Sequence, residues 1–338
     1  MLQRKLGKTD IEASVVAFGA WAIGGWMWGG CDEKDAIEAI HASLDHGVNF
    51  IDTAPMYGYG RSETIIGKVL KGRRDQVVLA TKCGLRWDLT EPRGVLYFHG
   101  DDQGVIRDRK GAKYKVYKYL HPDSIQYELE QSLRRLRTDH VDLYQTHWQD
   151  DSTPIADTMA YLETLKDQGK ILAIGVSNAD LDHLKAYGPI DCDQERYSML
   201  DRRMEEDGCL EHCRENNISV LAYSPLVHGL LTGTISPERK YNPGDLRNNN
   251  PRFSPENINR VNAMLTEFKP IADAHGATIS QLVIAWTFRQ PGVTHVLCGA
   301  RSETQAIDNA RAGEIPLADN EIQHMNEIIQ SLGTGMGP

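Results

Sequence analysis

Eight short apolar runs, separated by segments with helical periodicity, constrain the fold of this chain more than any other sequence feature. Runs that are apolar on both faces are typical of parallel strands covered by helices. Eight strand–helix repeats favour a closed (β/α)8 TIM barrel of the α/β class over an open sheet. The runs lie at 15–18, 48–52, 77–81, 141–145, 171–175, 190–194, 218–222 and 294–298. The helical segments lie at 33–46, 61–71, 122–136, 154–168, 178–187, 204–216 and 302–312.

No linker rich in Pro, Gly or Ser divides the 338 residues, so we expect a single domain over 1–338. Two connections, at about 86–120 and 225–256, are too long to be simple turns, as is the C-terminal segment 312–338. Loops of this length in a compact domain are usually functional. We therefore expect them to be long loops at the C-terminal face of the barrel, forming walls of a site.

The composition excludes several classes of partner. A net charge of −10 would repel nucleic acid, and no apolar run approaches the ~20 residues that cross a bilayer. Six dispersed cysteines predict free thiols in a reducing compartment, and we expect the cytoplasm. Cys209, His212 and Cys213 are close in sequence, but two further ligands at metal spacing are missing, so we predict no metal. The sequence does not indicate an oligomeric state.

Polar residues end several of the apolar runs, and in a barrel these ends meet at one mouth. They are Asp52, Lys82, His147, Ser177, Gln194 and Tyr223. The segment DTAPMYGYGRSE adds Tyr57, five residues after Asp52, in a loop flanked by glycines. A free phenol has a pKa near ~10, so proton exchange at neutral pH needs a cation beside it. We expect Lys82, paired with Asp52, to be that cation and to lower the pKa of Tyr57.

His147, in YQTHWQD, could donate a hydrogen bond to a substrate carbonyl. Taken singly, a strand-end Asp or Lys is more often a surface ion pair, and a lone Tyr or His more often a core residue. The GYG at 58–60 lacks the third glycine of a dinucleotide-binding fingerprint, so we do not predict a Rossmann fold. A catalytic site is indicated because four such residues, Asp52, Tyr57, Lys82 and His147, occur together at or just after neighbouring strand ends.

The order DTAxxYGxxxSE, TK, LYQTHW, GVSN and YSPL resembles the aldo-keto reductases, with matches through most of residues 1–312. The resemblance implies an oxidoreductase that transfers a hydride between a nicotinamide cofactor and an aldehyde, ketone or sugar carbonyl. It also implies a catalytic tetrad of Asp52, Tyr57, Lys82 and His147, with Tyr57 as general acid in reduction and general base in oxidation.

The resemblance further implies a cofactor that lies extended across the barrel mouth. Ser177, Asn178 and Gln194 would hold its carboxamide, although Ser and Asn are also common in turns and helix caps. The ring of Tyr223 would stack on the nicotinamide. The other implied cofactor residues are Gly19, Ala20, Trp21, Asp52, Ser224, Leu226, Gly299, Ala300, Arg301, Gln305, Asp308 and Asn309.

The segment GARSETQAIDNA departs from the Lys-Ser pair and later Arg that many members of that family carry. Arg301 can still recognise a 2′-phosphate, because a planar guanidinium binds phosphate in a bidentate manner. We therefore expect NADP(H), with NAD(H) as the alternative.

The predicted substrate pocket consists of Trp21, Tyr57, His147 and Trp148, with Trp26 and Trp28 as further wall residues. Charges in the 86–120 connection favour a sugar or another polar carbonyl, although a solvated surface hairpin is the simpler interpretation. These charged and polar residues are Arg86, Arg93, His99, Asp101, Asp102, Arg107, Asp108, Arg109 and Lys110.

Three other functions remain open. The potassium-channel β subunits share this barrel and bind NADP(H) but act mainly through a partner, so a regulatory subunit is the main alternative. A Schiff-base aldolase using Lys82 and a metal-dependent hydrolase are the others, and the chain has no HxH metal signature.

Overall fold

A computed structural model describes residues 1–106 and 112–332 of the chain. Eight parallel strands form a closed barrel, in which each strand pairs with the next one along the chain and the last pairs with the first. This confirms the predicted TIM barrel, and each strand overlaps one of the eight predicted runs. The strands are β3 (Val16–Gly19), β4 (Phe50–Asp52), β5 (Val78–Cys83), β10 (Val141–Thr146), β11 (Ile171–Ser177), β12 (Cys192–Arg196), β13 (Ser219–Tyr223) and β14 (Val293–Cys298).

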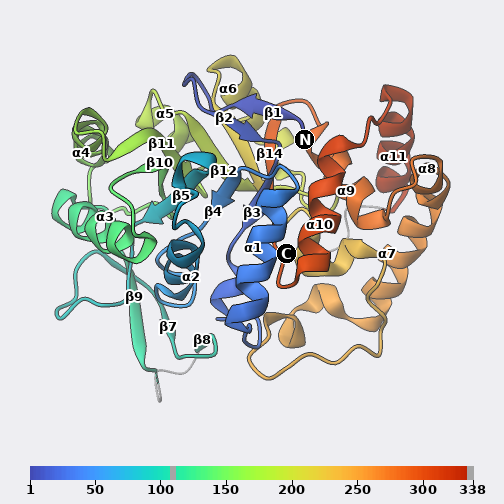
Figure 1. Ribbon diagram of the computed structural model, residues 1–338, viewed down its shortest axis with the longest axis horizontal. Coiled ribbons are helices and arrows are strands. Elements are labelled where there is room, and N and C mark those ends of the chain that lie inside the picture. Colours follow the sequence, from blue (N-terminus) through green and yellow to red (C-terminus); the bar gives the residue numbers. More distant parts are fainter. Residues whose placement is uncertain (107–111, 333–338) are drawn as a thin grey trace.

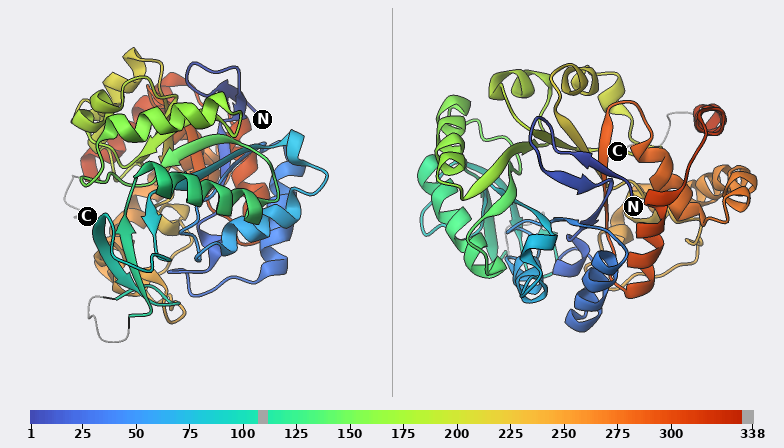
Figure 2. Two further views of the ribbon diagram at one scale, coloured as in Figure 1. Left: turned by 90° about the vertical axis from the view of Figure 1, so that its left-hand side faces the viewer. Right: turned by 45° about the horizontal axis from the view of Figure 1, so that its top comes forward.

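A ring of helices surrounds the barrel (Figures 1 and 2). Seven of them correspond to the predicted helical segments: α1 (Glu33–Asp45), α2 (Arg61–Val69), α3 (Pro122–Leu136), α4 (Ile155–Asp167), α5 (Leu181–Tyr187), α6 (Cys209–Glu215) and α10 (Glu303–Arg311). Helix α6 begins five residues later than predicted. Gly208 before it has a φ of 84°, and residues Arg203–Glu205 form a separate 3-10 turn.

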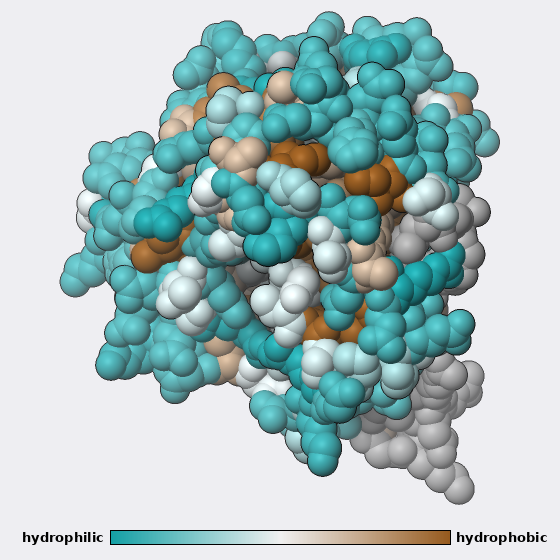
Figure 3. All heavy atoms as spheres, turned by 90° about the vertical axis from the view of Figure 1, so that its right-hand side faces the viewer, coloured by the Kyte–Doolittle hydropathy of each residue, from teal (hydrophilic) through white to brown (hydrophobic). Residues whose placement is uncertain are grey.

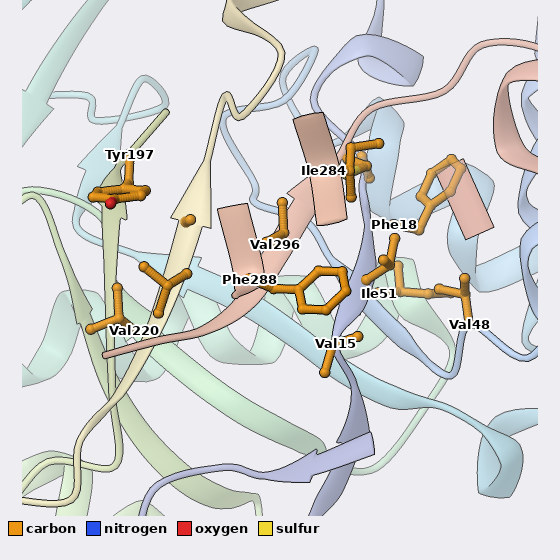
Figure 4. Close-up of a cluster of buried hydrophobic side chains, with 14 of the residues drawn as sticks. Val15, Phe18, Val48, Ile51, Tyr197, Val220, Ile284, Phe288 and Val296 are labelled. Atoms are coloured by element: carbon orange, nitrogen blue, oxygen red, sulfur yellow. The ribbon is translucent and has the colours of Figure 1, made fainter. Parts of the chain in front are cut away.

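Three helices between β13 and β14 had no counterpart in the sequence prediction: α7 (Pro255–Glu267), α8 (Lys269–Ala274) and α9 (Ile279–Phe288). In α9 every residue from Gln281 to Phe288 is buried. A helix that is buried all round lacks the alternation of apolar and polar faces by which an amphipathic helix is recognised. Figure 4 shows Phe288 of α9 beside Val296 of β14 and Val15, which is how this helix covers the barrel.

The 86–120 connection was predicted to be a long loop, but it has regular secondary structure. It folds into a four-stranded antiparallel sheet, which we call the insertion sheet: β6 (Leu85–Arg86), β9 (Tyr114–Lys118), β7 (Val95–Gly100) and β8 (Val105–Ile106), in that order across the sheet. It projects from the end of the molecule opposite the N-terminal hairpin (Figure 1). Of the charged residues predicted in this connection, Arg107, Asp108, Arg109 and Lys110 lie outside the described residues.

The other two long segments differ from each other. Residues 225–256 form an irregular connection with short 3-10 helices at Val227–Thr232, Leu246–Asn249 and Pro251–Phe253, in agreement with a long loop. The C-terminal segment instead contains a helix, α11 (Asp319–Leu332), which packs against α7. On that side of the molecule, where α7, α8, α10 and α11 lie, the surface is mostly hydrophilic with scattered apolar side chains (Figure 3).

The interior of the barrel is a packed core. An N-terminal hairpin of β1 (Gln3–Lys5) and β2 (Glu12–Ser14) lies across the end opposite the insertion sheet (Figure 2). The interior cluster takes Leu6 and Ala13 from this hairpin region and at least one apolar residue from each of the eight barrel strands. The barrel is therefore closed at this end, which leaves the opposite mouth for a site. Within residues 1–106 and 112–332, none of the helices is long and apolar enough to cross a bilayer.

His295 is a buried polar residue near the closed end. Its Nδ1 lies 3.1 Å from the carbonyl oxygen of Ser14 and its ring meets Phe50 edge-on, while Nε2 has no hydrogen-bond partner in the described chain. Because a carbonyl only accepts, Nδ1 carries the proton and Nε2 is bare. Burial lowers the pKa of His295 from 6.5 to about 4.

Stability should therefore fall as the pH drops from about 6.5 to 4, since the unfolded chain binds a proton there that native His295 excludes. In urea unfolding across this range, the free energy of unfolding of the wild type should decline more steeply than that of His295→Asn, by about 1.4 kcal/mol per pH unit. His324→Asn, which changes an exposed ring on α11, should follow the wild type. Parallel curves for wild type and His295→Asn would contradict the prediction.

Candidate active site

One large cavity, of about 560 Å³, opens at the mouth of the barrel. It lies where the C-terminal ends of the barrel strands converge, as the polar strand ends predicted. Every predicted site residue except Lys82 lines it. The set comprises Gly19, Ala20, Trp21, Asp52, Tyr57, His147, Trp148, Ser177, Asn178, Gln194, Tyr223, Ser224, Leu226, Gly299, Ala300, Arg301, Gln305, Asp308 and Asn309.

Lys82 lies directly behind the cavity wall, with its side chain fully buried. Its Nζ donates to both carboxylate oxygens of Asp52, at 2.9 and 2.7 Å, and to the carbonyl oxygen of Thr53 at 2.9 Å. Its fourth contact is with the phenolic oxygen of Tyr57, at 3.2 Å. A charged ammonium can remain in the interior only with such partners. The ion pair therefore holds a cation against Tyr57.

Backbone packing fixes the loop that carries Tyr57. Gly58 has a φ of 67°, and a Cβ atom there would lie 2.3 Å from the carbonyl oxygen of Gly24. A Cβ on Gly24 would in turn lie 2.7 Å from the backbone of Tyr57. Only glycine fits at these two positions, so the close approach of the two backbones determines where the phenol points.

The pKa of Tyr57 moves in the direction opposite to the one predicted. Burial, and then the negative charge of Asp52, raise it well above the value near 10 of a free phenol. Burial also lowers the pKa of Lys82, against the opposing effect of Asp52. Because the carboxylate largely balances the ammonium, the phenol is surrounded by little net positive charge. Tyr57 is therefore protonated at neutral pH. The expectation that Lys82 lowers the pKa of Tyr57 was wrong for the protein without a ligand.

His147 follows β10 and faces Tyr57 across the cavity, with 5.8 Å between the ring centroids. Its backbone N–H donates to the carbonyl oxygen of Cys83, which ties it to the strand that carries Lys82. Burial, followed by the positive charge of Lys82, lowers the pKa of His147 well below 6.5. The imidazole is therefore neutral at physiological pH and can donate one hydrogen bond while remaining uncharged.

Gln145 is a site residue that the sequence analysis missed. It is fully buried on β10, in register with Lys82, and its Nε2 donates to Asp52 Oδ1 at 3.2 Å. Gln194 Nε2 donates to the same carboxylate oxygen at 2.8 Å. A Cβ on Gly175 would lie 2.8 Å from the Gln145 side chain, so that glycine makes room for it. Side chains two positions apart in a strand lie on the same face. The spacing of two residues between Gln145 and His147 could therefore have identified Gln145 as a site residue.

Ser177, Asn178 and Tyr223 form a hydrogen-bonded chain along the cavity wall. Asn178 Nδ2 donates to the carbonyl oxygen of His147 at 3.0 Å, and its Oδ1 accepts from the hydroxyl of Tyr223 at 2.8 Å. Ser177 Oγ donates to the carbonyl oxygen of Gln194 at 2.8 Å. These side chains thus link the ends of four neighbouring strands, β10 to β13. Their polar groups are held in place before any ligand arrives.

The last two residues of the motif DTAPMYGYGRSE have structural roles. Ser62 Oγ donates to the carbonyl oxygen of Ala20 at 3.0 Å and lies 2.9 Å from the hydroxyl of Thr53. Glu63 accepts from Thr81 at 2.6 Å and from Arg135 at 2.6 Å, and its side chain is fully buried. Both residues brace the segments that carry Asp52, Tyr57 and Lys82.

Two long segments meet over the cavity. Trp28 forms an isolated bridge with Asp245, and the N–H of Leu246 donates to the carbonyl oxygen of Met27 at 3.0 Å. The N–H of Met27 donates to the carbonyl oxygen of Gln103 in the insertion sheet, at 3.1 Å. We call residues 25–31 and 241–250 the strap; residues of both segments line the cavity, and the strap is hydrogen-bonded to the turn between β7 and β8.

Arg301, the predicted 2′-phosphate residue, reaches this strap. Its Nη1 donates to the carbonyl oxygen of Trp28 at 3.1 Å, and its guanidinium lies 5.8 Å from the centre of the Trp28 ring. Arg247 lies 5.3 Å from the same ring and is paired with Asp245. Within the described residues, Arg301 has no carboxylate at ion-pair distance, so its charge remains uncompensated.

Three of the implied cofactor residues, Gln305, Asp308 and Asn309, already have contacts within the protein. Gln305 Oε1 accepts from the N–H of Arg301, and Asn309 Nδ2 donates to the carbonyl oxygen of Gly299. Asp308 accepts from Thr278 and, at 2.8 Å, from Gln281, which joins α10 to α9. All three still line the cavity, but these contacts already use part of their hydrogen-bonding capacity.

The cavity wall around the predicted substrate pocket is richer in aromatic residues than predicted. Trp21 and Trp148 line it as expected, and so do Trp26 and Trp28. The residues that the sequence analysis missed are Met56, Leu85, Tyr97, Phe98, Val105 and His228. Most of them lie in the insertion sheet or in the 225–256 connection, where no repeating pattern marks a residue as facing a cavity.

No group of three or more His, Cys, Asp or Glu side chains placed to hold a metal ion occurs within residues 1–106 and 112–332. Cys209 and Cys213 are both buried on α6. All six cysteines are free thiols.

Comparison with known proteins agrees with this architecture. A family model described as "Aldo/keto reductase family" matches residues 15–330. The NADH-specific methylglyoxal reductase of Escherichia coli (strain K12) is 42% identical over 336 residues, covering 97% of this chain and 98% of that protein. The aldo-keto reductase YhdN of Bacillus subtilis (strain 168) is 39% identical over 340 residues, with 98% and 95% covered. The solved glycerol dehydrogenase of Gluconobacter oxydans superposes with a TM-score of 0.84 at 35% identity, covering 99% of this chain and 97% of that one.

Removing only one partner of the buried ion pair should destabilise the fold strongly. Asp52→Asn leaves the ammonium of Lys82 without its counter-ion, and breaking a buried pair in this way costs about 3–5 kcal/mol. The double variant Asp52→Asn/Lys82→Met removes both charges and should recover much of that loss. Urea unfolding of the two variants beside the wild type measures the difference. A double variant less stable than Asp52→Asn would show that the pair is not what holds this site together.

Proposed function

Because the chain belongs to the aldo-keto reductase family, we propose that it interconverts a carbonyl and an alcohol with a nicotinamide dinucleotide, and that Tyr57 exchanges the proton. The chain is an oxidoreductase acting on carbonyl groups. The observation that carries the proposed role of Tyr57 is its position. Its hydroxyl faces a cavity on one side and lies 3.2 Å from the ammonium of Lys82 on the other.

The chain's own groups suit a dinucleotide in this cavity. Its volume of about 560 Å³ lies within the range of ligand and cofactor sites. It extends from the Tyr57 end to the N-terminus of α10, whose backbone amides suit an anion. Two buried polar atoms in its wall, Trp28 Nε1 and His228 Nδ1, have no partner among the described residues. Unsatisfied donors and acceptors of this kind are uncommon and point to a ligand.

When bound, the dinucleotide supplies or accepts the hydride at the substrate carbon. Tyr57 then gives its proton to the carbonyl oxygen in reduction and takes it back in oxidation. Its raised pKa keeps the phenol protonated, which is the form that reduction needs. The Nζ donor of Lys82 stabilises the phenolate oxygen as the proton leaves.

Neutral His147 donates a hydrogen bond to the same carbonyl oxygen and so orients the substrate. Asp52 acts on Lys82, not on the substrate: together with Gln145 and Gln194 it fixes the direction in which the ammonium points. The chain of Ser177, Asn178 and Tyr223 offers a prearranged polar wall for the carboxamide of the cofactor.

For the form of the cofactor we propose NADP(H), with Arg301 binding the 2′-phosphate and NAD(H) as the alternative. The uncompensated charge of Arg301 supports this choice, because a guanidinium without a carboxylate partner is available to a phosphate. The NADH-specific name of the relative from Escherichia coli supports the alternative. A direct comparison of the two cofactors therefore decides between them.

The other functions fit less well. A regulatory subunit is the weaker alternative: a probable voltage-gated potassium channel subunit beta of Arabidopsis thaliana is 32% identical to this chain, whereas the two reductases named above are 42% and 39% identical. An aldolase would need the amine of Lys82 to reach the substrate, but Lys82 is fully buried behind the wall and committed to four contacts. We keep the cytoplasm as the expected compartment on the basis of the free thiols.

Tyr57→Phe should lower kcat by about 10²–10⁴-fold, the usual contribution of a general acid, while the dissociation constant for the cofactor stays within about twofold. Steady-state NADPH oxidation with a reducible aldehyde and a fluorescence titration of NADPH provide the two measurements. Tyr59→Phe, in the same loop but stacked on Tyr114, is the matched control and should retain activity. Retained turnover in Tyr57→Phe would disprove the proposed role.

Arg301→Ala should raise KM for NADPH by about 10–100-fold, the value of a charge-assisted hydrogen bond, and leave KM for NADH within about twofold. Arg311→Ala, which changes an exposed arginine at the C-terminal end of α10, should change neither. An equal effect of Arg301→Ala on both cofactors, or a wild type that prefers NADH, would refute the 2′-phosphate contact.

A further inference from the structure

We propose that the preferred substrate is a carbonyl compound with an aromatic or similarly flat apolar body, and that Tyr97 and Phe98 of the insertion sheet bind this body. The inference rests on the proposed function. It replaces the sugar or other polar carbonyl that the charge of the 86–120 connection favoured.

The insertion sheet contributes only apolar and aromatic side chains to the cavity, as far as the described residues extend. They are Leu85, Tyr97, Phe98 and Val105. Tyr97 lies 5.4 Å from Trp148 between ring centroids, and Trp148 follows His147 in the chain. This wall is therefore at the Tyr57 and His147 end of the cavity, away from the end formed by Arg301 and α10.

Three described charged residues of the insertion, Arg86, Asp101 and Asp102, have partners within the protein. Arg86 donates to Asp88 at 2.7 Å and to Ser124 at 2.9 Å. Asp101 accepts from two backbone N–H groups in its own turn, and Asp102 pairs with Lys113. These described charges do not line the cavity, and they therefore say little about the substrate.

Contacts among aromatic rings hold the wall in place. Phe98 stacks on Trp26, with 5.8 Å between centroids and 19° between planes, and Trp26 Nε1 donates to the carbonyl oxygen of Asp101. Behind Tyr97 and Trp148, the ammonium of Lys118 lies 5.0 and 5.4 Å from the two ring centres. The rings are thus fixed before a substrate enters, so little conformational entropy is lost on binding.

Such a wall selects against sugars for a physical reason. A hydroxyl group that leaves water and meets aromatic carbon loses its hydrogen bonds without replacement, whereas an apolar ring gains by the same transfer. A flat ring can also stack on Tyr97 or meet it edge-on. Val105, which is 47% exposed, and Tyr97, which is 38% exposed, line the cavity while still in contact with solvent. They therefore retain apolar surface for a substrate to cover.

The test measures kcat/KM of the wild type for 4-nitrobenzaldehyde, methylglyoxal, glyceraldehyde and xylose, and for glycerol in the oxidative direction, at saturating cofactor. We expect 4-nitrobenzaldehyde to have the highest value and xylose the lowest of the carbonyl compounds. Methylglyoxal and glycerol are included because proteins similar to this chain are named for them.

Tyr97→Ser removes the ring from the wall and should lower the ratio of kcat/KM for 4-nitrobenzaldehyde to that for methylglyoxal by about tenfold or more. Leu96→Ser is the matched control. Leu96 precedes Tyr97 on β7 and is 41% exposed, but it does not line the cavity, so it should leave the ratio unchanged. If Tyr97→Ser fails to fold, Trp148→Leu tests the same wall from the barrel side, with the same expected fall in the ratio.

The outcomes separate the two proposals. If none of the five compounds is turned over, the proposed function fails. If turnover occurs but any compound other than 4-nitrobenzaldehyde has the highest kcat/KM, or if the ratio is the same in Tyr97→Ser and Leu96→Ser, the substrate inference is overturned while the proposed function stands.

Discussion

The buried ion pair between Lys82 and Asp52 is the interaction on which the rest of this site depends. It places an ammonium inside the barrel mouth, where a charge is tolerated only because a carboxylate and a backbone carbonyl receive its hydrogen bonds. The same pair determines the ionisation of its neighbours. Burial and the carboxylate keep Tyr57 protonated, while burial and the ammonium keep His147 neutral. One charged pair thus prepares two uncharged hydrogen-bond donors that face the same cavity.

The cavity joins two chemically different regions. The strand ends and the N-terminus of α10 form a polar region with an uncompensated cation at Arg301, which suits a phosphorylated cofactor. The insertion sheet and the tryptophans form an aromatic region, which suits the body of a substrate. The strap connects both, because its hydrogen bonds reach Gln103 in the insertion while Trp28 lies against Arg247 and Arg301. Cofactor and substrate would therefore meet at Tyr57, on the boundary between the two regions.

The sequence predicted the barrel because its strands and amphipathic helices repeat with fixed periods. Asp52, Lys82 and His147 were found because strand ends converge at the mouth whatever the details of packing. Prediction failed where no period exists. The fully buried helix α9 has no polar face, and the insertion sheet is built from short strands interrupted by turns.

The identity and order of the groups at the barrel mouth were thus fixed by the sequence, since strand order follows chain order in this fold. Only the tertiary structure decided two further points. One is the ionisation of Tyr57: a pKa depends on the balance between burial and all charges around the group, and that balance reversed the expected direction. The other is the aromatic character of the cavity wall that the insertion sheet forms. The sequence of the insertion contains both charged and aromatic residues. Successive side chains of a regular strand alternate between faces, yet Tyr97 and Phe98 both line the cavity, at the point where the pairing of β7 with β9 shifts register.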